Sequence, residues 1–148
     1  MSNYNAAIDY DAARNYNDVP TGFARYLVQV DWNNDGDYTD THENITDDVL
    51  SITSTTGRNF ASQLTGKASA GSLEVTVKNN TGKYSPFNTS SVLTGNLVPN
   101  RPIQWAVTVP TETTIWTGYI ESIIPAVQKG VYTTAKITAF GIFKKFAT

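Results

Sequence analysis

The stretch Ser72-Leu73-Glu74-Val75-Thr76-Val77-Lys78 decides the fold class of this chain. Its apolar side chains stand at every second position, and its polar side chains stand between them. Successive side chains of a strand point to opposite faces of a sheet, so this alternation predicts a strand with one buried face and one exposed face. The stretch therefore predicts one strand of a sheet that covers a core.

Further segments on both sides of this strand have the composition of strands. They are rich in β-branched and aromatic residues and lie at 26–31, 49–53, 102–109, 115–124 and 131–140. The last two are joined near Gly130, which supplies a hairpin turn. Because a helical pattern is almost absent and most turns are short, the sequence predicts an all-β fold, an antiparallel split barrel or a sandwich.

Two connections are longer than a minimal barrel needs. Residues 57–71 are rich in Gly, Ser and Ala, whereas residues 79–101 carry several large side chains. Irregular connections beyond about 12–15 residues are uncommon inside a compact domain and are usually functional or disordered. We expect residues 79–101 to cover the sheet and to supply subunit contacts through Tyr84, Phe87 and Leu97. Packing of these side chains within their own chain is the alternative.

The first 22 residues differ in composition from the rest of the chain. They are rich in Asn, Asp, Ala and Tyr, and they end at the turn Pro20-Thr21-Gly22. We expect an arm at 1–22 that docks on its own body or reaches a neighbour through Tyr4, Tyr10 and Tyr16; a frayed terminus is the alternative. The remaining residues, 23–148, are long enough for one β-barrel domain.

The densest group of carboxylates follows the first predicted strand, in the stretch DWNNDGDYTDTHE at 31–43. Asp31, Asn33 and Asp35 alternate there, and Gly36 permits a sharp turn. This spacing directs several oxygens toward one hard cation. It predicts a calcium loop with ligands from Asp31, Asn33, Asp35, the backbone carbonyl of Asp37, and Glu43 or Asp40.

This loop departs from the helix-flanked calcium loop in two ways. A strand precedes it, and His42 occupies the twelfth position, where a bidentate Glu is expected. An EF-hand is therefore not expected. A non-helical calcium loop remains, and so does an Asx-rich connection in which Asn and Asp side chains cap their own backbone.

Composition excludes several classes of function. A net charge of −2 without a basic stripe argues against nucleic-acid binding. No apolar run approaches the ~18 residues of a membrane span, and we expect no signal peptide. The chain has no cysteine, which excludes thiolate chemistry. It has one histidine, which excludes a metal site with two histidines and means that a Ser-His-Asp triad would have to use His42. We therefore expect a protein that is not an enzyme.

The three tryptophans, Trp32, Trp105 and Trp116, allow one other interpretation. Tryptophan faces stack on sugar rings, although each of these lies in or beside a predicted strand, where packing is favoured. A calcium-dependent carbohydrate-binding β-sandwich is therefore the alternative function.

A series of motifs, taken in order, resembles the N-terminal module of tail proteins from long-tailed bacteriophages, which include distal-tail, tail-tip and baseplate-hub components. The series spans about residues 25–125 and consists of VQVDWNNDGDYTD at 28–40, Arg58, the strand and turn at 71–79, GKYSPFN at 82–88, LVPNRP at 97–102 and Trp-Thr-Gly at 116–118. Members of that family usually continue for hundreds of residues, and the arm at 1–22 is not part of the pattern.

The resemblance implies a split barrel of the tail-tube type. Copies of it would form a ring of three-fold or six-fold symmetry around the tail channel, in contact with other tail proteins. The chain would then be a structural virion protein, located in the tail and assembled in the host cytoplasm. The acidic loop would be a peripheral or inter-ring element that calcium stiffens.

Overall fold

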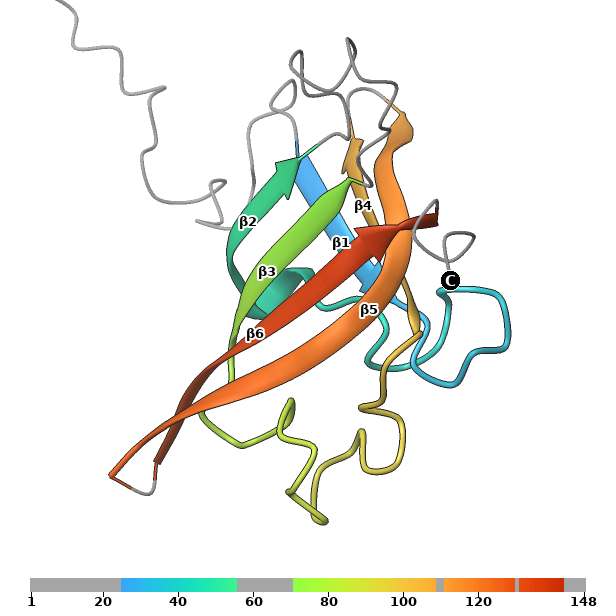
Figure 1. Cartoon of the computed structure of the whole chain (residues 1–148). Coiled ribbons are helices and arrows are strands. Elements are labelled where there is room, and N and C mark those ends of the chain that lie inside the picture. The colour runs from blue at the N-terminus through green and yellow to red at the C-terminus, as the bar shows by residue number, and fades with distance from the viewer. Residues whose placement is uncertain (1–24, 56–70, 109–110, 130, 143–148) are drawn as a thin grey trace, which may run out of the picture.

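The computed structural model describes residues 25–55, 71–108, 111–129 and 131–142 of the 148-residue chain. The 3-10 turn η1 (Thr46–Asp48) precedes β2, and the strands are β1 (Arg25–Val30), β2 (Val49–Thr55), β3 (Ser72–Lys78), β4 (Pro102–Thr108), β5 (Glu112–Gln128) and β6 (Val131–Gly141). They form one sheet in the order β1-β4-β5-β6-β3-β2, and every neighbouring pair is antiparallel. The sheet curls into a half-barrel with β1 and β2 at its edges (Figure 1). The predicted all-β antiparallel fold is confirmed.

The strand that decided the fold class behaves as its alternation predicts. Leu73, Val75 and Val77 are buried in the core, whereas the side chains between them are partly exposed. β3 lies between β2 and β6, so its buried face meets the side chains that the curled sheet collects on its inner side, among them Val28, Ile103 and Ile137.

β5 is longer than its sequence indicates, because it begins at Glu112 and reaches Gln128. Pro125 lies within this strand although proline cannot donate a hydrogen bond to a neighbouring strand. β4 pairs with β5 only as far as Tyr119, so at Pro125 no strand of the described residues lies on the side of β5 that faces away from β6. The missing N–H is therefore tolerated, and the β5–β6 hairpin extends past the rest of the sheet (Figure 1).

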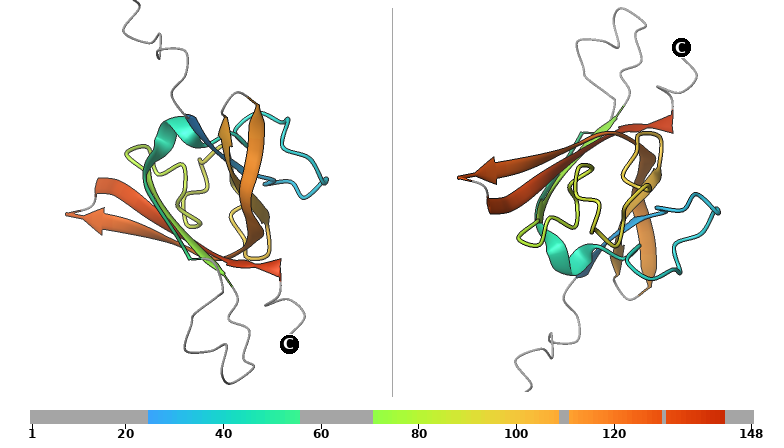
Figure 2. Two further views of the ribbon diagram at one scale, coloured as in Figure 1. Left: turned by 90° about the horizontal axis from the view of Figure 1, so that it is seen from above. Right: turned by 90° about the horizontal axis from the view of Figure 1, so that it is seen from below.

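Residues 79–101 cover the core, as predicted. Tyr84, Leu93 and Leu97 from this connection are buried among the strand side chains. The backbone is a chain of turns in which the carbonyl of each third residue, at 79, 82, 85, 88 and 91, accepts a hydrogen bond from the N–H three positions later, so the series ends at the N–H of Thr94. In the views along the curl, this connection lies across the space that the sheet encloses (Figure 2).

Side-chain bonds connect this cover to η1. The hydroxyl of Tyr84 donates to Asp48, and Lys83 Nζ lies 2.9 Å from Asp48 Oδ2. The backbone N–H of Tyr84 donates to Asn79 Oδ1 at 2.8 Å. The ring of Tyr84 is buried, and its hydroxyl and backbone N–H have partners within its own chain, so intramolecular packing accounts for this residue.

The Trp-Thr-Gly motif at 116–118 has a packing explanation. A Cβ added at Gly118 would lie 2.2 Å from the carbonyl oxygen of Phe140 and 2.5 Å from the ring of Trp116. Side chains at positions i and i+2 of a strand share one face, so the indole of Trp116 lies over Gly118. Only glycine leaves room for that ring between β5 and β6.

Several predictions fall outside the described residues. They are the arm at 1–22 with Tyr4, Tyr10 and Tyr16, the motif residue Arg58 and the turn residue Gly130. Within the part of the chain that the structure describes, no helix has the length and apolar character needed to cross a membrane.

Candidate metal centre

The acidic loop begins where β1 ends, and backbone bonds hold its two ends together. The N–H of Val30 donates to the carbonyl of Glu43 at 2.9 Å, and the N–H of Asp31 donates to the carbonyl of Pro102 at 3.0 Å. A β-bridge pairs Gln29 with Asn44 next to them. The first and last acidic residues of the stretch, twelve positions apart in the sequence, are thereby brought side by side.

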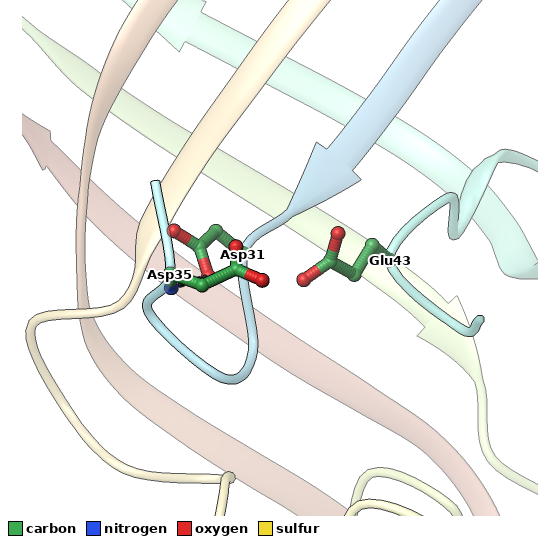
Figure 3. Close-up of side chains that lie close together, drawn as sticks. All are labelled: Asp31, Asp35 and Glu43. Atoms are coloured by element: carbon green, nitrogen blue, oxygen red, sulfur yellow. Dashed lines mark hydrogen bonds between the residues drawn. The ribbon is translucent and has the colours of Figure 1, made fainter. Parts of the chain in front are cut away.

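Asp31, Asp35 and Glu43 converge on one point. One carboxylate oxygen from each lies within 4.8 Å of the others. Asp31 and Glu43 are each 1% exposed, whereas Asp35 is exposed. Their carboxylates face one another across the mouth of the loop (Figure 3). Since carboxylate oxygens are the ligands that hard cations prefer, these three residues could hold a metal ion.

The carboxylate of Asp31 organises the loop backbone. Its Oδ1 accepts hydrogen bonds from the N–H groups of Asn34 and Asp35, and its Oδ2 accepts one from Gly36 at 3.0 Å. Asn34 and Gly36 have φ values of 64° and 98°, and this left-handed backbone turns successive N–H groups toward one acceptor. The Asx-rich capping predicted as an alternative is therefore present, and it coexists with the convergence of carboxylates.

Glu43 is the least satisfied member of the group. Its Oε2 accepts a hydrogen bond from the N–H of Asp40 at 3.0 Å. Its Oε1 is buried and has no hydrogen-bond partner among the described residues. Burial, together with the negative charges of Asp31 and Asp40, raises the pKa of Glu43 above its ordinary value.

The other two predicted ligands lie beside the group. Asn33 is exposed, and its amide donates to Asp35 Oδ2 at 3.0 Å and to Asp40 Oδ2 at 2.6 Å. The carboxylate of Asp37 accepts hydrogen bonds from the N–H and the hydroxyl of Thr39, both at 2.9 Å, and these bonds lower its pKa. The side chain of Asp37 is therefore engaged away from the triad.

Trp32 connects the acidic loop to the core. Its indole N–H donates to the carbonyl of His42 at 3.1 Å, and its ring centroid lies 6.3 Å from that of Tyr84. Trp32 is buried, as expected for packing, and His42 itself is exposed with a φ of 76°. The sequence analysis did not predict this supporting role of Trp32. The signal that could have indicated it is that Trp32 directly follows Asp31 in the sequence.

A second feature lies at the opposite side of β1. An apolar groove of about 310 Å³ opens between the edge strands β1 and β2, lined by Tyr26, Val49, Leu50, Ser51, Ile52 and Trp105. Tyr26 and Leu50 are 47% and 50% exposed. Of the predicted contact residues of the 79–101 connection, Tyr84 and Leu97 are buried in the core, whereas Phe87 is 85% exposed.

No protein-family model matches the chain, and no curated protein matches it.

Proposed function

We propose that this chain is a non-enzymatic structural component of a bacteriophage tail, which forms a ring around the tail channel or docks on one. The motifs at about 25–125 suggest the family, and the open half-barrel is the structural observation that supports assembly. A half-barrel has two edge strands, and the part of an edge that is not covered can pair with another chain.

The two edges are not equivalent. β2 pairs with β3 on one side and ends the sheet on the other. β1 pairs with β4, and the outer side of its last residues is covered by the segment after the acidic loop, through the Ile45 N–H and the carbonyl of Val28 at 3.0 Å. Two different edges on one subunit favour head-to-tail contacts, and such contacts close into rings when the rotation permits.

The groove between these edges offers apolar surface for such a contact. Leu50 stands at a register irregularity of β2 and is half exposed, and Tyr26 faces the same groove from β1. Exposed apolar surface next to an unpaired strand is typical of association sites. A net charge of −2 adds little repulsion between identical subunits.

The β5–β6 hairpin offers a further element for assembly. Pairing continues to Gln128 and Val131, beyond Lys78 of β3, which pairs with Thr134. The hairpin tip therefore projects from the half-barrel (Figure 1). A projecting ribbon of this kind can reach a neighbouring subunit without rearrangement of the core.

The oligomeric state tests this proposal. Light scattering on a sizing column, at high protein concentration, is expected to give the mass of three or six subunits. Leu50→Asp in the groove should reduce that mass to one subunit, whereas the matched control Val92→Asp, at an exposed apolar residue outside the groove, should leave it unchanged. A monomer by both light scattering and sedimentation equilibrium would overturn the ring.

A calcium-dependent carbohydrate-binding module is the second candidate, and Trp105 is the observation that favours it. Its ring is only partly buried and lines the apolar groove, which would allow part of the ring to stack on a sugar. Quenching of tryptophan fluorescence by sugars, abolished by chelator and by Trp105→Ala, would support this module over the tail component.

A further inference from the structure

We propose that Asp31, Asp35 and Glu43 bind one hard divalent cation and that this cation is Ca²⁺. The inference goes beyond the proposed function, because a cation would bind a single subunit whatever the chain assembles with. It rests on two separate observations: the convergence of three carboxylates within 4.8 Å, and the buried Glu43 oxygen that lacks a partner.

Backbone hydrogen bonds on both sides fix the position of Glu43 at the end of the loop. Its carbonyl accepts the N–H of Val30, and its own N–H donates to the carbonyl of Asp40 at 3.3 Å. The side chain is thus held at the base of the loop, 1% exposed, with Asp31 facing it (Figure 3). A buried carboxylate needs a proton, a donor or a cation, and a cation also compensates Asp31.

Asp31 and Asp35 keep acceptor capacity for an ion. An ionised carboxylate has about four lone-pair sites. Three backbone N–H groups occupy sites on Asp31, one on Oδ2, so this oxygen remains available. Asp35 accepts the N–H of Asp37 on one oxygen and the amide of Asn33 on the other, which leaves a site on each. Because Asp35 is exposed, the ion can enter from solvent and retain waters.

The donor set favours Ca²⁺, and the spacing of the oxygens is compatible with this ion. All three ligands are oxygens, and the one histidine of the chain is not part of the group. Ca²⁺ accepts irregular coordination, and two ligands on opposite sides of it lie about 5 Å apart, against about 4 Å for Mg²⁺. Oxygens that already lie within 4.8 Å of one another can therefore bind Ca²⁺ without contraction.

Terbium luminescence on the full chain tests the site. Trp32 directly follows Asp31, so excitation of its indole should sensitise a Tb³⁺ ion bound at the triad. We expect one bound ion per chain, displaced by Ca²⁺ and much less effectively by Mg²⁺. Titration calorimetry with Ca²⁺ alone should give the same stoichiometry.

Matched variants separate the triad from the general acidity of the loop. Asp35→Asn and Glu43→Gln should each weaken Ca²⁺ binding by about tenfold or more, because each removes a charged ligand. Asp37→Asn is the control: it leaves the backbone carbonyl of Asp37 in place and removes the same charge two positions from Asp35, from a carboxylate that bonds Thr39 instead. Circular dichroism should show the same strand content in all variants. Since Asp35 is exposed, its variant keeps the test valid if Glu43→Gln unfolds.

Three results would overturn the inference. One is the absence of both luminescence and binding heat at millimolar Ca²⁺. Another is an equal loss of affinity in Asp37→Asn and Asp35→Asn, which would indicate ions attracted by loop charge only. The third is displacement of Tb³⁺ by Mg²⁺ as readily as by Ca²⁺, which would remove the assignment of the ion.

Discussion

Replacement of Glu43 by glutamine should reverse the sign of its effect on stability when calcium is added. Glutamine has nearly the same shape as glutamate and carries no charge. In chelator the substitution removes a buried carboxylate that faces Asp31 and has an oxygen without a partner. The variant should therefore be at least as stable as the wild type under that condition, because the penalty for a buried like-charge pair disappears.

Calcium should separate the two proteins. A ligand at a hundred times its dissociation constant stabilises the folded state by about 2.7 kcal/mol. For a chain of 148 residues this corresponds to a rise in Tm of about 8 °C. The wild type should show this rise, and Glu43→Gln should lose most of it.

Differential scanning calorimetry measures the Tm of the wild type and of Glu43→Gln, each in chelator and in millimolar CaCl₂. Asp37→Asn again serves as control and should keep the calcium-dependent rise. If Asx turns alone stabilise the loop, Glu43→Gln raises Tm equally in both buffers and calcium changes nothing. That outcome, or a full calcium response in Glu43→Gln, would refute the reasoning.

Other substitutions test the fold directly. Gly118→Ala should destabilise the protein by about 3 kcal/mol, because the added methyl meets the backbone of Phe140. Urea denaturation measures this loss of stability. A change below about 1 kcal/mol would contradict the close approach of β6 to Gly118. Tyr84→Phe should cost about 2 kcal/mol by the same assay, since a hydrogen bond to a charged group is lost. Burial alone would raise the pKa of Asp48, but hydrogen bonds from Tyr84 and Lys83 and the Lys83 charge outweigh it and lower the pKa. The stability from Asp48 is therefore fully present above its unfolded-state pKa of about 3.9 and is lost as pH falls through the lower folded-state pKa. Asp48→Asn should flatten the acid limb of a curve of Tm against pH. An unchanged limb would contradict this assignment.

Local patterns explain why the strands could be predicted from the sequence. The alternation of 72–78 depends on nearest neighbours, so it reports its buried face directly. The end of β5 was not predicted, because the expected strand at 115–124 continues through Pro125 to Gln128. Proline is tolerated there because β4 does not extend along that part of β5, which is a property of the sheet order. A strand boundary that depends on a distant strand cannot be obtained from composition.

The candidate site shows the same division. The spacing of Asp31 and Asp35 around a glycine turn is local and identified two members of the triad, and Glu43 was predicted as a further ligand with Asp40 as its alternative. The burial of Glu43 depends on the bridge between Gln29 and Asn44, and the placement of Tyr84 depends on Asp48, 36 positions away. Tyr84 was therefore predicted at a subunit contact, although its partners lie inside its own chain.

The chain of turns in the 79–101 connection restricts how the length of this connection can change. Its hydrogen bonds recur every three residues, and Tyr84 and Leu93, both buried, are separated by three such repeats. One residue inserted between them would shift every later hydrogen bond of the series by one position and turn the side chain of Leu93 out of the core. An insertion of three would add one complete repeat and preserve both anchors. The length of this connection is therefore expected to vary in multiples of three residues.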